Sequence, residues 1–229
     1  MPTRLSRQLL EFLVVRVAPF LLCCDAEGTI TERVILGESR VPPDIRNAQS
    51  LRACLSTPVL DEWLALVIDC ICRQAVMDRI VVLDGVAFDL SLLPATDLHN
   101  RRRVWISLMS LANRSSVDGC VTRHALQHHE WGALDPLSRY QLDTLRFITL
   151  GLSNQQIAEH MHRSKRAVEW HIRHIHRLLG ASARECLARV GRHAGLDAFQ
   201  DDEWNAVLAT RPARRSIEEF AGTKTERAA

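Results

Sequence analysis

The side chains best suited to chemistry lie close together in residues 164–179, which are rich in Arg and His. Apolar residues recur there at helical spacing and predict a helix with one buried face; they are Val168, Ile172, Ile175 and Leu179. The opposite face carries Glu169, Trp170, Arg173, His174 and Arg177. Arg173 is able to form two hydrogen bonds with guanine, Glu169 to accept one from cytosine, and Trp170 to pack against a thymine methyl group. Taken alone, this set of side chains fits the base edges of DNA, and it fits a solvated helix face as well.

Polar residues at helix starts are suited to the phosphate groups of the same DNA. The N-terminus of a helix presents unpaired backbone N–H groups, and its dipole favours an anion. The residues that we expect to contact phosphates are Ser153, Asn154, Ser164, Lys165, Arg166, His174 and Arg177. Such contacts hold a protein on the duplex without reading its sequence.

Short helices are predicted on both sides of these residues. A capping box at Ser138 starts the first helix, which ends near Gly151. The others are expected at residues 153–161, 164–179 and about 182–193. Two short helices joined by a tight turn form a helix-turn-helix, whose second helix enters the major groove.

Residues 134–199 resemble the LuxR-type helix-turn-helix of bacterial transcription regulators. The matching residues are Gly151-Leu-Ser-Asn-Gln-Gln-Ile-Ala158, Ser164-x-x-Ala-Val168, His171, Ile175, Leu179-Gly180 and Ser182-x-Arg184. The chain departs from the family pattern at Arg139-Tyr-Gln141, which replaces Pro-Arg-Glu, at Ala167, which replaces Thr, and at Leu178, which replaces Lys. The resemblance implies that Glu169, Trp170 and Arg173 face base edges.

Charge is distributed unevenly along the 229 residues. The net charge of the whole chain is only +2, but residues 134–199 contain ten Arg or Lys and six Asp or Glu, which gives +4. A compact basic segment beside a nearly neutral one is typical of a nucleic-acid-binding domain that is fused to another domain.

The sequence before residue 112 predicts a sheet with helices beside it. Strands are expected at residues 20–24, 29–36, 79–83, 87–93 and 104–111, with short helices at 44–55 and a long helix at 59–77. This order resembles the PAS fold over residues 19–111. The predicted fold is therefore an α+β domain with a five-stranded antiparallel sheet, followed by an all-α domain of four helices.

Five segments are expected along the chain. They are an N-terminal amphipathic helix at 1–18, a PAS-like sensor or dimerisation domain at 19–111, a linker helix at 112–133, the LuxR-type DNA-binding domain at 134–199 and a partly disordered extension at 200–229. Because one helix-turn-helix covers only a few base pairs, we expect a homodimer on an inverted repeat.

Several function classes are disfavoured by the sequence. It has no glycine-rich phosphate loop and no Gly-x-Ser-x-Gly motif, so we do not expect an enzyme. An apolar run long enough to cross a membrane is absent as well. Residues 1–133 contain no lysine, which argues against a phosphorylated receiver domain. The histidines of the basic segment lack a cysteine or carboxylate that would complete a metal site.

Two questions about ligands stay open at this point. Cys120, His124, His128 and His129 have helical spacing, which fits a metal or redox site as well as an exposed linker helix. PAS-like domains hold haem, flavin, a small metabolite or nothing, and no residue here selects a cofactor. We expect no evident cofactor and leave a ligand in a PAS-like pocket as an alternative.

These observations together predict a cytoplasmic bacterial transcription regulator. Its expected partners are double-stranded DNA and a second copy of the chain, with RNA polymerase as a further candidate. The N-terminal domain would control DNA binding through a ligand or a partner. The alternative is a protein-interaction module in which the helix-turn-helix keeps its fold but has lost useful affinity for DNA.

Overall fold

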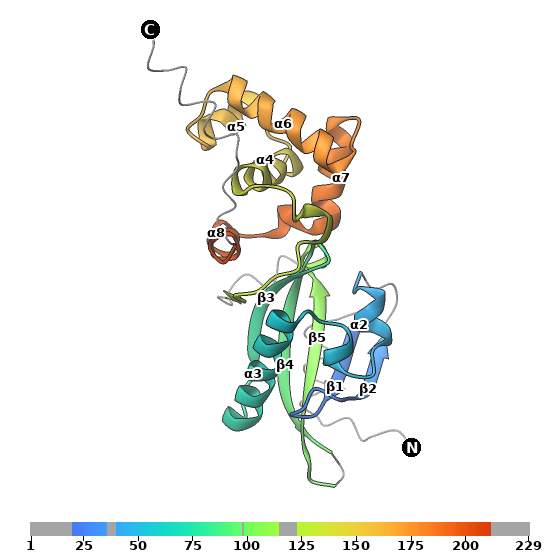
Figure 1. Cartoon of the computed structure of the whole chain (residues 1–229). Coiled ribbons are helices and arrows are strands. Elements are labelled where there is room, and N and C mark those ends of the chain that lie inside the picture. The colour runs from blue at the N-terminus through green and yellow to red at the C-terminus, as the bar shows by residue number, and fades with distance from the viewer. Residues whose placement is uncertain (1–19, 36–39, 98, 115–122, 212–229) are drawn as a thin grey trace.

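The computed structural model describes residues 20–35, 40–97, 99–114 and 123–211 (Figure 1). The helix that we expect at residues 1–18 lies outside these ranges. The N-terminal part contains β1 (Phe20–Cys24), β2 (Ile30–Ile35), α2 (Pro43–Asn47), α3 (Thr57–Arg73), β3 (Met77–Leu83), β4 (Val86–Thr96), β5 (Arg102–Ser110) and β6 (His124–Ala125). The C-terminal part contains α4 (Arg139–Thr149), α5 (Asn154–His160), α6 (Lys165–Leu179), α7 (Arg184–Ala194) and α8 (Asp201–Ala209).

The sheet has the strand order β2-β1-β5-β4-β3-β6. Strands β1 to β5 pair in antiparallel fashion, with β5 between β1 and β4. The predicted five-stranded antiparallel sheet of a PAS-like domain is therefore confirmed. The short strand β6 was not predicted; it pairs in parallel with β3 and makes the sheet mixed.

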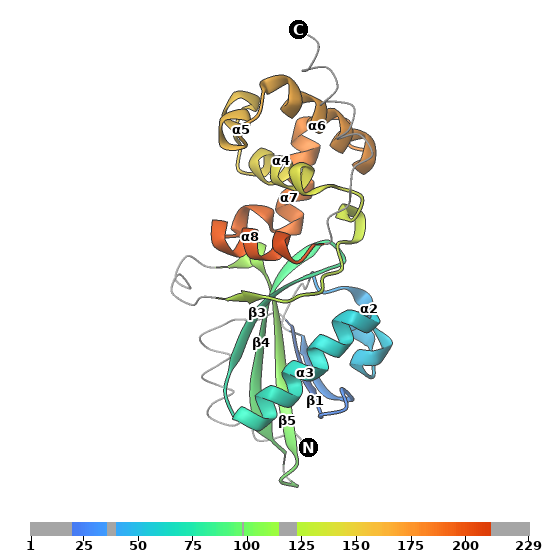
Figure 2. The ribbon, with the colours of Figure 1, turned by 60° about the vertical axis from the view of Figure 1, so that its left-hand side comes forward.

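Helix α3 covers one face of the sheet (Figure 2). Pro58 in its first turn has the backbone angle that a helix start requires. The apolar stripe of α3, which includes Trp63 and Val67, joins Phe88 of β4 in the first hydrophobic core. The helix ends at Arg73, before the predicted residue 77, because Gln74 adopts a left-handed conformation with a φ of 51°.

The opposite face of β3 and β4 is buried by the C-terminal part of the chain. Ile80, Val82 and Ala87 on this face share a second hydrophobic core with Leu142 of α4 and Trp204 of α8. Figure 1 shows α8 and the end of α7 next to this end of the sheet. The two parts of the molecule are thus joined by a continuous apolar core as well as by the connecting chain.

The expected linker helix at residues 112–133 is wrong for the described parts of that segment, which are 112–114 and 123–133. There the chain runs along the edge of β3: the N–H of Leu126 donates to the carbonyl of Ile80 over 3.0 Å, and that of Glu130 to the carbonyl of Val82 over 2.8 Å. The segment satisfies polar groups that the edge strand would otherwise expose. Its histidines therefore do not form a helical face, and Cys120 lies outside the described residues.

Helix α8 begins the extension that was expected at residues 200–229. It is tied to α4, because the Nε1–H of Trp204 donates to Asp143 over 2.7 Å. Burial raises the pKa of Asp143, and the bond from Trp204 lowers it in part. Residues 212–229 lie outside the described part. No helix among the described residues is long and apolar enough to cross a membrane.

Candidate nucleic-acid interface

Helices α5 and α6 form the predicted helix-turn-helix. The turn between them contains His162, which has a left-handed φ of 51°. Ser164 starts α6 by accepting a hydrogen bond from the N–H of Ala167 over 3.2 Å, and Gly180 ends it with a φ of 61°. In Figure 1, α6 lies in the part of the molecule farthest from the sheet.

The apolar face of α6 fixes the orientation of its polar face. Val168, Ile172 and Ile175 are buried in the second core, together with Leu145 of α4 and Ile157 of α5. A helix that is anchored on three such positions cannot rotate about its axis without exposing apolar surface. The side chains on the other face are therefore presented to solvent in a fixed direction.

The three residues predicted to contact bases all lie on the solvent-facing side of α6. Glu169, Trp170 and Arg173 are exposed, and Trp170 is 39% exposed although it is large and apolar. An indole that is left in water on a fixed helix face is available to a partner surface. The structure thus brings these three residues together as the sequence predicted.

Two histidines hold the indole ring of Trp170. The ring of His171 lies edge-on at a centroid distance of 5.0 Å, and that of His174 at 5.2 Å. Such edge-to-face pairs are favourable and restrict the ring orientation. His174 is half-buried and lies beside Trp170, a position that sequence reasoning did not foresee for this predicted phosphate contact.

The residues predicted to contact phosphates divide into two groups. Lys165, Arg166 and Arg177 are exposed basic side chains. The hydroxyl groups of Ser153 and Ser164 instead serve as helix caps: Ser153 accepts from the N–H of Gln156 over 3.3 Å, and Ser164 accepts from that of Ala167. A hydroxyl that caps a helix has less capacity left for a phosphate.

Asn154 has a partner that the sequence did not reveal. Its side-chain oxygen accepts a hydrogen bond from the Nη1 of Arg184 over 2.7 Å, and the same guanidinium contacts the carbonyl oxygen of Leu152. Arg184 thereby ties α7 to the start of α5. The amide N–H groups of Asn154 are the part of its side chain that is able to donate to a phosphate.

Arg163 adds a positive charge that sequence reasoning missed. Its Nη2 lies 3.2 Å from the hydroxyl oxygen of Tyr140, and its guanidinium carbon lies 5.1 Å from the centre of that ring. Both residues are exposed. The guanidinium is thus held against Tyr140 at the start of α4. Its place directly before the helix cap is the sequence signal that would have found it.

Metal chemistry has no candidate at this site. Among the residues that the structure describes, no group of three His, Cys, Asp or Glu side chains is placed to hold a metal ion. What the site offers is a fixed, mostly basic helix face with one carboxylate and one indole among the guanidinium groups. This set matches the acceptors, donors and methyl groups of the major groove.

A comparison with known protein families agrees with this geometry. The model of the family described as bacterial regulatory proteins, luxR family (GerE), matches residues 135–190. No curated protein matches the chain.

Among solved structures, a Vibrio cholerae VqmA–ligand–DNA complex is 12% identical, with a TM-score of 0.40 over 87% of this chain and 92% of that one. The Vibrio cholerae VqmA dimer in the absence of target DNA is also 12% identical, with a TM-score of 0.34 over 91% and 97%. A phage VqmA–DPO complex is 15% identical, with a TM-score of 0.34 over 87% and 94%.

The capped helices, the left-handed turn and the buried positions of α6 coincide with the residues that the family model matches. Residues 135–190 form a LuxR-type helix-turn-helix domain.

Proposed function

We propose that this chain is a bacterial transcription regulator that binds a specific DNA sequence through α6. The observation that carries the proposal is the exposed set of Glu169, Trp170 and Arg173 on a helix whose other face is buried. Arg173 would read guanine, Glu169 would accept a hydrogen bond from cytosine, and Trp170 would contact a thymine methyl group. Lys165, Arg166 and Arg177 would hold the phosphates on either side.

A homodimer is the form in which the chain would act. A single recognition helix reads only a few base pairs, and two of them raise the specificity to the level that a genome requires. Of the apolar residues on α7, Leu187 is buried in the second core, whereas Cys186 and Val190 are partly exposed. Val190 also packs against that core, which leaves Cys186 as an apolar residue of α7 that would add to a dimer contact made mainly by the N-terminal parts.

Control by the N-terminal domain forms part of the proposal. The sheet and the DNA-binding domain share a core, so a ligand or partner that shifts β3 or β4 would also act on α4 and α8. Such a ligand regulates only if it prefers one arrangement of the two domains. Cytoplasmic location and a contact with RNA polymerase stay predictions.

Selection of DNA from a pool of random duplexes tests the proposal. The full chain should enrich an inverted repeat, and Arg173→Glu should abolish the enrichment because it reverses a charge on α6. Arg189→Glu is the matched control, since Arg189 is exposed on α7 and not on α6. Failure of the unchanged chain to enrich any sequence would refute the proposal and favour a protein-interaction module.

A further inference from the structure

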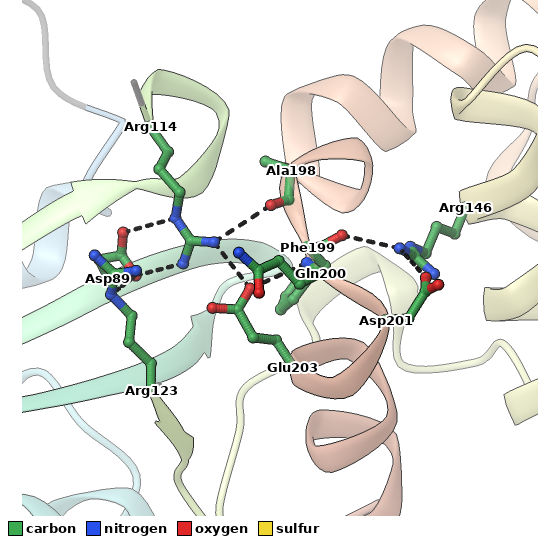
Figure 3. A network of polar contacts seen from close by, with 9 residues as sticks. All are labelled: Asp89, Arg114, Arg123, Arg146, Ala198, Phe199, Gln200, Asp201 and Glu203. Carbon is green, nitrogen blue, oxygen red and sulfur yellow. Dashed lines mark hydrogen bonds and ion pairs between the residues drawn. The ribbon is translucent and has the colours of Figure 1, made fainter. Parts of the chain in front are cut away.

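A cluster of four charged side chains is buried between the sheet and α8. It consists of Asp89 on β4, Arg114 and Arg123 in the connecting segment, and Glu203 on α8; we call it the Arg114 cluster (Figure 3). The side chains of Arg114 and Asp89 are only 10% and 4% exposed, and those of Glu203 and Arg123 are 7% and 3% exposed. The four charges sum to zero, as burial requires.

Arg114 makes contacts with both parts of the molecule. Its Nε and Nη2 donate to the two carboxylate oxygens of Asp89 over 3.2 and 2.8 Å. Its Nη1 donates to Glu203 over 2.8 Å and to the carbonyl oxygen of Ala198 over 3.4 Å. Arg123 completes the cluster at 3.0 Å from Asp89. Arg114 thus links β4 to the chain that follows the matched residues 135–190.

The residues around Glu203 connect this cluster to the DNA-binding helices. Arg146 of α4 donates to the carbonyl oxygen of Phe199 over 2.9 Å and to Asp201 over 2.8 Å (Figure 3). The packing is also close at the end of α7, where a Cβ on Gly195 would lie 3.3 Å from the backbone nitrogen of Ala112. Residues 195–204 are therefore held against the sheet on one side and against α4 on the other.

A buried network of this kind specifies an arrangement more than it adds stability. Desolvation of the charges offsets much of their attraction, whereas loss of one partner leaves a buried charge without compensation. The planar guanidinium of Arg114 satisfies two carboxylates and a carbonyl only when β4 and α8 are correctly placed. Sliding of α8 on the sheet would break these bonds together.

We propose that Arg114 is a positioning residue that fixes the direction of α6 relative to the sheet domain. In a dimer held together by the N-terminal parts, this direction sets the distance and rotation between the two recognition helices, and so the spacing of half-sites that the protein accepts. The inference rests on the proposed DNA-binding function. It assigns a role in site selection to residues that do not touch DNA.

Binding of the full chain to a series of duplexes tests this role. One duplex carries a single half-site, one carries the selected inverted repeat, and others carry the repeat with one to five base pairs inserted at its centre. The variants are Arg114→Met and Glu203→Gln. The N–H of Gln200 donates to the Glu203 carboxylate over 3.1 Å and caps the start of α8. Glu203→Gln removes the charge but retains an oxygen that accepts this hydrogen bond, so the cap is kept.

The unchanged chain should lose affinity about tenfold or more when half a helical turn is inserted. Both variants should reduce this penalty to about twofold while their affinity for the single half-site stays the same. Arg73→Met is the matched control, because it removes an exposed ion pair with Asp69 on α3, and it should keep the full penalty. Hydrogen exchange should become faster in α8 and β3 of the variants and stay unchanged in α6.

Folded variants that keep the full spacing penalty would overturn the inference. If Arg114→Met does not fold, Glu203→Gln decides the question alone. Absence of half-site binding by the unchanged chain would instead count against the proposed function. The two failures are thereby distinguishable.

Discussion

Arginines in two regions of this molecule have the same chemistry and opposite surroundings. On α6, Arg166, Arg173 and Arg177 are exposed on a helix whose only carboxylate is Glu169. In the Arg114 cluster, Arg114 and Arg123 are buried and neutralised by Asp89 and Glu203. The first set is available to an external anion, and the second has all its partners within the chain. Burial and the charges that surround it therefore decide the role of an arginine in this chain.

Burial has a direct effect on Arg114. Desolvation alone would lower the pKa of its guanidinium, but the hydrogen bonds to Asp89 and Glu203 outweigh it and raise that pKa. Arg114 therefore stays charged throughout the folded state. Loss of either carboxylate partner should therefore lower the free energy of unfolding more than loss of a surface carboxylate does.

The largest expected effect is the loss of a charge from the buried region. Asp89→Asn would leave Arg114 and Arg123 with only one carboxylate between them, and we expect it to lower the free energy of unfolding by about 3–5 kcal/mol. Urea unfolding measures this change. Asp69→Asn, in the exposed pair with Arg73, is the control and should cost at most about 0.5 kcal/mol. Equal losses of unfolding free energy for Asp89→Asn and Asp69→Asn would show that the buried carboxylate contributes no more than the exposed one.

In the exposed region, a similar deletion should affect DNA binding and not folding. Arg173→Ala should lose about 1–3 kcal/mol of discrimination at one base pair of the selected site, with an unchanged unfolding midpoint. Competition binding with each single-base variant of the site measures it. Lys165→Ala should weaken binding to all these duplexes alike, as expected for a phosphate contact. Uniform weakening by Arg173→Ala would show that this residue does not read a base.

Acid should weaken the contact that His129 makes with the edge of β3. Burial and the neighbouring His128 lower the pKa of His129 to about 4, and its Nδ1 accepts the N–H of Val82 over 3.2 Å. The unfolded chain binds this proton near pH 6.5 and the folded chain only near pH 4, so stability is full above pH 6.5 and falls as the pH drops between these values. Across this whole range we expect a loss of about 3 kcal/mol. His129→Asn offers an acceptor that does not titrate, and thermal unfolding across this pH range should show a smaller loss for it.

Two substitutions at Ser164 distinguish its role as a helix cap from a role as a phosphate contact, and their expected effects are small. Ser164→Ala should cost about 1 kcal/mol of stability through loss of the cap of α6. Ser164→Asp should restore the cap but weaken DNA binding, since it adds a negative charge near the phosphates. Unfolding and binding measured on both variants test this. Equal DNA affinity of Ser164→Asp and the unchanged chain would place the phosphate backbone away from this end of α6.

The exposed region could be predicted from the sequence because its determinants are local. The capping residue Ser164, the buried position Ile172 and the terminating Gly180 all lie within one helix length. The contact between the sheet and α8 depends on pairs such as Arg114 and Glu203, which are 89 residues apart. No rule of sequence spacing connects residues so far apart. One signal was present: Ile80 to Leu83 is a continuous apolar run, all of it buried, and such a run is typical of a strand that is covered on both faces.

The same reasoning explains the errors at the segment boundaries. A linker helix was predicted over residues 112–133, but in residues 123–133 the edge of β3 provides backbone hydrogen bonds that a short polar helix would not have matched in stability. Helix α8 was missed because its partners Asp143 and Arg146 belong to α4. In each case a contact made far along the chain prevailed over a local pattern.

The salt dependence of binding to the selected duplex decides whether the basic side chains of α6 face DNA while those of the Arg114 cluster do not. Each phosphate contact releases counterions, so the logarithm of the binding constant should fall linearly with the logarithm of salt concentration. Lys165→Ala should reduce the slope by about 1, whereas Arg114→Met should leave it unchanged. A slope near zero for the unchanged chain, or a slope reduced by Arg114→Met and not by Lys165→Ala, would show that the basic side chains of α6 do not face DNA.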